Sequence, residues 1–405
     1  MNFSQLKSER LIFLYWITFG HIIIHWYINL FSLILPNLEN EFGLSAVELG
    51  LFTTTQMGIA SGLMLVGGYL ADTFLNRQNT ILIFAVFILG ISFFIIGTVQ
   101  SYISTLITTT LIGVSIALWH PTAMGNLSLK FPSNRGMALS VHGAGGSIGD
   151  SLSPLIVGSL IMTFTWRSIM QFHLIPIIIF CILMWKNLSN KQIIQTNNIE
   201  LTKVKFDMLT YVANMKEMLT NHQALSVMVS NSLINMSRLA VITFLPIYLS
   251  KTLEFSSSKL GLYISLLYLL GIVSQPIMGI VSDKFGRKIV LIPSFLIMGL
   301  TTLLISLTQN DILLAIIIGI LGAFFYPILN LNQTAIMDVA GTNIQASSMG
   351  ITSLISWPSV VISPIIAGLL VDKFNIEIAF IYAGIIALSA AFIILPVKFR
   401  ILPLK

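Results

Sequence analysis

Long apolar runs follow one another along almost the whole chain, and each is long enough to cross a lipid bilayer as a helix. A span needs about 20 apolar residues, because the hydrocarbon core is about 30 Å thick and a helix rises 1.5 Å per residue. Only 9% of the 405 residues are charged, against about 25% in a soluble domain. We therefore expect an all-α integral membrane protein with twelve transmembrane helices. The predicted spans are 11–36, 47–71, 80–99, 102–129, 136–163, 168–187, 223–249, 258–282, 288–307, 311–337, 345–371 and 376–397.

A long polar segment divides these spans six and six. We predict an N-terminal six-helix bundle over 1–187, a cytoplasmic linker over 188–222 and a C-terminal six-helix bundle over 223–405. The first apolar run has no cleavable leader before it, so we expect its helix to stay in the mature chain.

Basic residues orient the spans. Cytoplasmic loops carry an excess of Lys and Arg, and placing both termini in the cytoplasm leaves few basic residues outside. The outer loops then hold only Arg167, Lys251, Lys259 and Lys373. We predict a multi-pass protein of the cell (inner) membrane with both termini cytoplasmic. The net charge of +6 is explained by this orientation, so nucleic acid is not an expected partner.

The two halves repeat one another in sequence. Leu35-Pro36 recurs as Leu245-Pro246, Gly113 to Pro121 recurs as Gly319 to Pro327, and Ser153-Pro154 recurs as Ser363-Pro364. Parallel repeats in a chain of spans predict two bundles related by an axis along the membrane normal. The substrate site is then expected between the bundles, near the middle of the membrane.

A short polar loop also occurs in both halves. The segment Gly279 to Lys288 reads GIVSDKFGRK, and Asp72 lies in a looser copy that has Leu75 and Asn76 where glycine and arginine would complete the pattern. With the internal repeat, this loop makes the chain resemble the major facilitator superfamily over its whole length. The resemblance implies alternating access, with the loop carboxylates latching the inner face shut. The alternative is that the loops only cap and orient helices. The gate candidates are Asp72, Arg77, Asp283, Arg287 and Lys288.

Polar side chains inside the spans are costly and usually functional. His21, His25 and Asn29 are four residues apart and form one stripe on the first helix, and Asn231 and Asn235 form a counterpart with Arg238 on the seventh. For Arg238 we weigh an anchor for an anionic or carbonyl-bearing substrate against a structural ion pair with Asp150. The candidate substrate-binding residues are His21, His25, Asn29, Trp119, His120, Asn231, Asn235, Arg238, Tyr326 and Trp357.

Proton coupling has its own candidates: Asp150, His120 and His142. A carboxylate buried among apolar side chains holds a proton more readily than one in water, and histidine changes charge near neutral pH. We expect no metal site, because no carboxylate or cysteine shares the His21/His25 stripe and Cys181 is the only cysteine. No cofactor is expected.

Three local patterns bear on the branch of the family. Gly149 to Gly158 resembles the helix 5 signature of drug and metabolite antiporters, with Ser153 and Val157 in place of two glycines. Thr109 stands where proton-coupled drug exporters have arginine. The Gly20-His21 and Trp119-His120-Pro121 runs are similar to the fosmidomycin-resistance group.

From this resemblance we predict a proton-coupled exporter of a small organic compound, working as a monomer in the lipid bilayer. The alternatives are a proton symporter that imports a small organic anion or metabolite and, more remotely, a membrane sensor that does not transport. An enzyme is not expected, because no nucleophile with its base stands out in the sequence.

Overall fold

The structure, a computed structural model, describes residues 3–131, 134–188, 208–340 and 345–399. All regular secondary structure in these residues is helical. Eleven helical stretches among the described residues are long and apolar enough to cross a membrane. The remaining predicted span, 136–163, corresponds to a helix of 26 residues that is rich in glycine and serine. The predicted all-α membrane architecture is confirmed.

The helices of the first bundle are α1 (Phe3–Phe42), α2 (Ala46–Thr73), the 3-10 turn η1 (Leu75–Arg77), α3 (Gln78–Thr98), α4 (Tyr102–Lys130), α5 (Arg135–Leu160), α6 (Trp166–Phe172) and α7 (Leu174–Leu188). Helix α8 (Met208–Thr220) comes next. The second bundle then comprises α9 (His222–Ile247), the π-helical turn η2 (Tyr248–Thr252), α10 (Ser257–Phe285), α11 (Arg287–Ile305), α12 (Asp311–Phe325), α13 (Pro327–Ala340), α14 (Gln345–Lys373) and α15 (Glu377–Ile394).

Two predicted spans are interrupted. The span 168–187 is divided into α6 and α7 at His173, and the span 311–337 is divided into α12 and α13 at Tyr326. Proline explains both breaks, because it has no N–H and its ring clashes with the carbonyl four residues earlier. Pro176 follows the first break and Pro327 follows the second. The predicted linker contains α8, and its residues 189–207 lie outside the described part of the chain.

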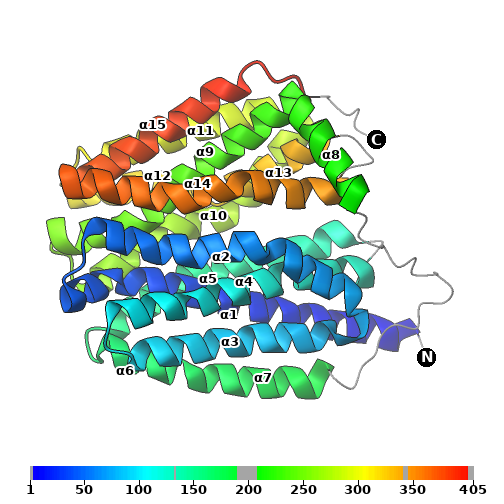
Figure 1. The fold of residues 1–405 in the computed structure, drawn as a ribbon, viewed down its shortest axis with the longest axis horizontal. Coiled ribbons are helices and arrows are strands. Elements are labelled where there is room, and N and C mark those ends of the chain that lie inside the picture. The colour runs from blue at the N-terminus through cyan, green and yellow to red at the C-terminus, as the bar shows by residue number, and fades with distance from the viewer. Residues whose placement is uncertain (1–2, 132–133, 189–207, 341–344, 400–405) are drawn as a thin grey trace.

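The two bundles lie side by side, with their helices running in the same general direction (Figure 1). Helix α2 packs along α14 and α5 packs along α10, so these two pairs form the seam between the bundles. The start of α1 and the end of α15 lie at one end of the molecule. We call this the terminal end and the opposite one the far end.

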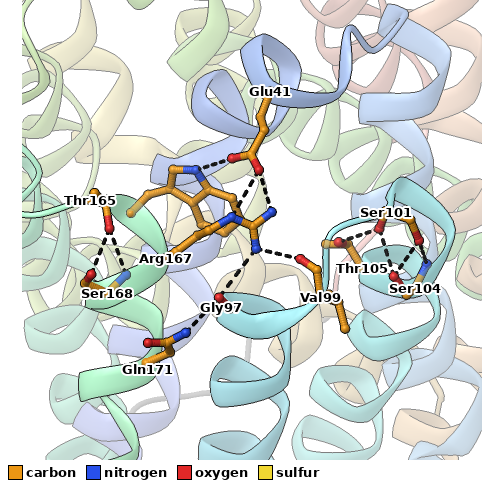
Figure 2. A network of polar contacts seen from close by, with 11 residues as sticks. Glu41, Gly97, Val99, Ser101, Ser104, Thr105, Thr165, Arg167, Ser168 and Gln171 are labelled. Carbon is orange, nitrogen blue, oxygen red and sulfur yellow. Dashed lines mark hydrogen bonds and ion pairs between the residues drawn. The ribbon is translucent and has the colours of Figure 1, made fainter.

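An arginine organises the far end of the first bundle (Figure 2). Arg167 lies at the start of α6 and donates to Glu41 near the end of α1, at 3.0 Å from Nε and 2.5 Å from Nη2. Its Nη1 donates to the carbonyl oxygens of Gly97 (3.4 Å) and Val99 (2.5 Å) at the end of α3. A guanidinium is favourable here because the last carbonyls of a helix lack partners and carry partial negative charge.

Helix α5 lies against α1 with almost no side chain between them. A methyl group on Gly145 would be 2.7 Å from the carbonyl oxygen of Thr18, and one on Gly149 would be 2.3 Å from that of Ile22. Small residues allow membrane helices to approach this closely. This close packing brings Asp150, the residue after Gly149, within hydrogen-bond distance of α1 side chains.

We predict that Gly149→Ala destabilises the protein, because the added methyl group forces α5 away from α1 and overpacking of this kind costs about 1–3 kcal/mol. Thermal unfolding in detergent should show a lower midpoint. The control is Gly279→Ala on α10, where a methyl group meets no atom within 4 Å. Equal midpoints for the two variants would contradict this account of the α1–α5 contact.

Candidate functional site

Six polar side chains from α1, α4 and α5 gather in the interior of the first bundle. We call them the polar cluster: His21, His25, Asn29, His120, His142 and Asp150. Most of them are buried, and His25 and His120 are only partly exposed. The four-residue spacing of the α1 stripe places its three members on one helical face, toward α4 and α5.

Asp150 is the acidic member of the cluster, and α1 provides both of its partners. Its Oδ2 lies 2.9 Å from His25 Nδ1, and its Oδ1 accepts a hydrogen bond from the Asn29 amide. The side chain is only 2% exposed. A buried carboxylate is tolerated when its oxygens are hydrogen-bonded, and here the two donors come from consecutive turns of one helix.

The histidines form a chain of ring contacts. His21 Nδ1 lies 2.7 Å from the carbonyl oxygen of His142, and the two rings stack with centroids 3.9 Å apart. His21 Nε2 lies 3.4 Å from His120 Nε2. The His120 ring is also 5.7 Å from that of His25. All three candidates for proton coupling therefore lie within one connected group.

Arg238 and Tyr326 approach this region from the second bundle. The guanidinium of Arg238 lies over the ring of Phe325, 4.5 Å from its centroid. Arg238 is 8% exposed, and its Nε–H is buried without a hydrogen-bond partner among the described residues. The Tyr326 ring lies 6.1 Å from that of His25. Asp150 contacts His25 in this structure, and it forms no ion pair with Arg238, so the considered Asp150–Arg238 pair is not formed.

The other candidate substrate residues have varied positions. Asn231 is buried and donates to Ser356 at 3.4 Å, whereas Asn235 is half-buried. Trp119 is completely buried, and a methyl group on Gly20 would touch its ring. Trp119 therefore fills the core between α4 and α1 and presents no surface to a substrate in this conformation.

Trp357 joins the two bundles. Its Nε1 donates to the carbonyl oxygen of Gly58 at 2.9 Å, which connects α14 to α2. The residue is 41% exposed. It is thus both part of the seam and open to a neighbouring molecule.

The gate candidates differ between the two loops. Arg287 binds Asp283 at 2.5 Å and Asp338 at 2.7 Å, which ties the α10–α11 loop to α13 inside the second bundle. Lys288 is half-buried. In the other loop, Asp72 and Arg77 are both exposed. The copy with the more complete motif thus forms the more ordered charge network.

The bundles are joined at the far end by a carboxylate that caps a helix of the opposite bundle. Asp372, near the end of α14, accepts hydrogen bonds from the backbone N–H groups of Ala46 (2.7 Å) and Val47 (3.1 Å) at the start of α2. A helix N-terminus carries partial positive charge and unpaired N–H donors, so it favours an anion. We call this contact the far-end latch.

Further hydrogen bonds between the bundles lie at the far end or near the middle of the helices. They join Ser32 to Ile242, Thr53 to Thr243, Thr54 to Val361, Asn40 to Lys251, Ser151 to Ser265 and Ser159 to Ser258. Backbone also meets backbone here, because a methyl group on Gly158 would be 2.5 Å from the carbonyl oxygen of Ser257. The structure is therefore closed at its far end.

The comparison with protein families identifies this architecture. The profile of the Major Facilitator Superfamily matches residues 17–256 and 227–403. The chain belongs to the major facilitator superfamily. It is a transporter and not an enzyme, and the predicted resemblance to the drug-exporter group is confirmed by its relatives.

Several curated relatives are transporters of bacteria. The fosmidomycin resistance protein of Escherichia coli is 24% identical over 325 residues, which are 77% of this chain and 76% of that protein. The riboflavin transporter RibZ of Clostridioides difficile is 24% identical over 342 residues, covering 72% and 74%. The uncharacterised transporter YhcA of Bacillus subtilis is 24% identical over 320 residues, covering 68% of this chain and 59% of its own length.

Solved structures show the same fold. A bacterial homologue of the human lysosomal transporter Spinster, in an inward-facing and unoccupied conformation, matches with a TM-score of 0.74 at 14% identity and covers 96% of both chains. A peptide transporter POT matches with a TM-score of 0.73 at 14% identity, covering 95% of this chain and 93% of its own.

Three further residues of this site were not predicted from the sequence. Asp372 binds backbone N–H groups, which leave no side-chain signal to pair with it. Asp338 lies on α13, 51 positions from its partner Arg287. Tyr268 of α10 is buried close to Asn29. The polarity of Tyr268 within an apolar span was an available signal, whereas Asp338 lies just beyond the predicted span 311–337.

We predict that Asp372→Asn loosens the far end. Hydrogen bonds to a charged group contribute about 1.5–3 kcal/mol, so loss of the charge should raise the population open at the far end by about tenfold. Double electron–electron resonance between spin labels at Gln100 and Asn375, in a Cys181→Ser background, should show more long distances.

The matched control for this experiment is Asp311→Asn. Asp311 also lies at the far end and binds Lys259 at 2.5 Å, but this pair is within the second bundle. The control should give the parental distance distribution. An unchanged distribution in Asp372→Asn would show that the latch does not hold the bundles together.

Proposed function

We propose that this transporter exports a small organic compound by alternating access and that proton flow drives the export. In this proposal the terminal end faces the cytoplasm, and the chain acts as a monomer. The positive-inside distribution of Lys and Arg supports that orientation. The family supports secondary transport, and the names of two relatives, fosmidomycin resistance protein and multidrug resistance protein MdtG, support export.

The observation that carries the proposal is the buried carboxylate of Asp150 beside the seam between the bundles. It is held by His25 and Asn29 of one helix and has no cation permanently attached to it among the described residues. Ionisable groups at membrane depth mark ion and proton pathways. Asp150 is therefore the proposed proton carrier, and His120 and His142 extend the path within the polar cluster.

The substrate is proposed to bind between the polar cluster and the second bundle. Arg238, which is buried and forms no ion pair with any acidic side chain that the structure describes, is the proposed anchor for an anionic or carbonyl-bearing group. Tyr326 and Trp357 offer aromatic surface, and His21, His25, Asn29 and His120 offer polar contacts from the first bundle. Asn231 and Asn235 belong to the same proposed lining, whereas Trp119 is proposed to act only by supporting α1.

In the transport cycle, the far-end latch is proposed to close the far end in one state, and the terminal loops are proposed to close the terminal end in the other. The structure has the far end closed. Asp283 is paired within its own bundle, and neither loop carboxylate binds a described residue of the opposite bundle. When the far end opens, Asp72, Arg77, Asp283, Arg287 and Lys288 are the residues proposed to close the terminal end. Each closed state is held by only a few kcal/mol, so that substrate and protons can shift the balance.

Import by proton symport remains the second candidate, because Arg238 could equally bind an anion arriving from outside. The name of the riboflavin transporter RibZ shows that relatives include a transporter of another class of compound. Transport direction separates the two functions. Efflux that stops when the proton gradient is reversed supports export, and accumulation inside vesicles along with protons supports import.

We predict that Asp150→Asn abolishes gradient-driven accumulation but leaves exchange down a concentration gradient, because the variant has no carboxylate to protonate. A substrate is first chosen by thermal shift in detergent, beginning with fosmidomycin and riboflavin. Uptake is then measured in inside-out vesicles with an imposed pH gradient.

Two further variants make the outcome decisive. Asp150→Glu keeps the carboxylate and should keep part of the coupled transport, and Asp311→Asn removes an exposed carboxylate and should be normal. If the Asp150→Asn protein is folded and has full gradient-driven transport, the proposed role of Asp150 is wrong.

A further inference from the structure

We propose that His21, His25 and His120 form a binding site for one divalent transition-metal ion of the zinc class. The inference concerns equilibrium binding, so it does not depend on the direction or the driving ion of transport. It arises because the fold brings a third imidazole from α4 to the two on α1. The sequence stripe alone lacked this third ligand, which was the reason for expecting no metal there.

The spacing of the three imidazoles suits one ion. One potential ligand nitrogen from each ring lies within 4.8 Å of the other two. His21 Nε2 and His120 Nε2 are 3.4 Å apart. Two nitrogens bound tetrahedrally to zinc at about 2.0–2.1 Å are about 3.3–3.4 Å from one another. This pair is thus already at ligand spacing, and the nitrogen of His25, which lies within 4.8 Å of both, would move closer to them on binding.

The second nitrogen of every ring is fixed by an acceptor. His21 Nδ1 faces the carbonyl oxygen of His142 at 2.7 Å, His120 Nδ1 faces that of Ile116 at 3.0 Å, and His25 Nδ1 faces the Asp150 carboxylate at 2.9 Å. A carbonyl or carboxylate can only accept, so Nδ1 carries the hydrogen in each ring. Histidines that bind metals are oriented in this way.

When the three rings are neutral, this tautomer leaves an Nε2 lone pair on each of them. His25 Nε2 is buried and has no hydrogen-bond partner among the described residues. Two lone pairs that face one another at 3.4 Å, as those of His21 and His120 do, repel unless a cation lies between them. The protein provides imidazole ligands, which suit zinc, nickel, copper and iron, and Asp150 supplies negative charge through His25.

Three protein ligands leave a fourth position open for water or for a donor atom of the transported compound. The Tyr326 ring of the second bundle lies 6.1 Å from the His25 ring, so the cluster faces the second bundle at His25. Arg238 is the opposing charge nearby, but its guanidinium is directed to Phe325 and forms no ion pair with the cluster. An ion bound here would therefore be partly exposed to the substrate site.

The test uses the full-length protein in detergent, stripped with chelator and titrated with Zn²⁺ by calorimetry. We expect one Zn²⁺ per chain, and X-ray absorption should count three imidazole nitrogens at about 2.0 Å. His21→Gln and His120→Gln should each abolish this binding. Asp150→Asn should weaken it by about 10–100-fold, as expected for loss of a group that orients a metal-binding histidine.

The matched control is His222→Gln, which removes an exposed histidine at the start of α9 and should bind Zn²⁺ like the parent. Thermal unfolding without metal verifies that each variant is folded. If His21→Gln fails to fold, the same measurement on His25→Gln and His120→Gln decides. Absence of Zn²⁺ binding by the parent, or equal binding by the folded cluster variants, would overturn the proposal and leave a proton shared between His21 and His120.

Discussion

The contact between α1 and α5 determines what the rest of this transporter can do. Because Gly145 and Gly149 let the two backbones approach closely, Asp150 on the next position of α5 reaches the side chains of His25 and Asn29. Lipid offers no partner to a polar group, so each one must be satisfied within the protein. The narrow gap between these helices makes that possible for a carboxylate and for the imidazoles around it.

The charged side chains make different contacts at the two ends of the molecule. At the far end, Asp372 binds the backbone at the start of α2, a contact that needs no particular side chain in the other bundle. At the terminal end, Arg287 draws Asp283 and Asp338 together within one bundle. The far-end contact joins the two bundles, whereas the terminal-end network lies inside the second bundle, and both involve side chains that are at least partly exposed.

The sequence was sufficient for the fold and for part of the site. Apolar run length and the internal repeat predicted the helical spans, and the four-residue spacing of the α1 stripe placed His21, His25 and Asn29 on one face. Contacts between side chains of different helices were harder to predict from the sequence. One of the two interpretations of Arg238 was an ion pair with Asp150, whereas in the structure His25 contacts this carboxylate. Which of two nearby side chains reaches a carboxylate depends on helix rotation and interhelical distance. The burial of Trp119 against Gly20 depends on the same packing.

The central claim is that the polar cluster controls which end of the protein is closed. The most direct measurement is the distance between spin labels at Asn76 and Lys284, exposed residues of the two loops at the terminal end, in the Cys181→Ser background at acidic and alkaline pH. The account predicts two distance populations whose ratio changes with pH in the parent and stays constant in Asp150→Asn. A single distance in the parent, or the same pH response in both proteins, would contradict it.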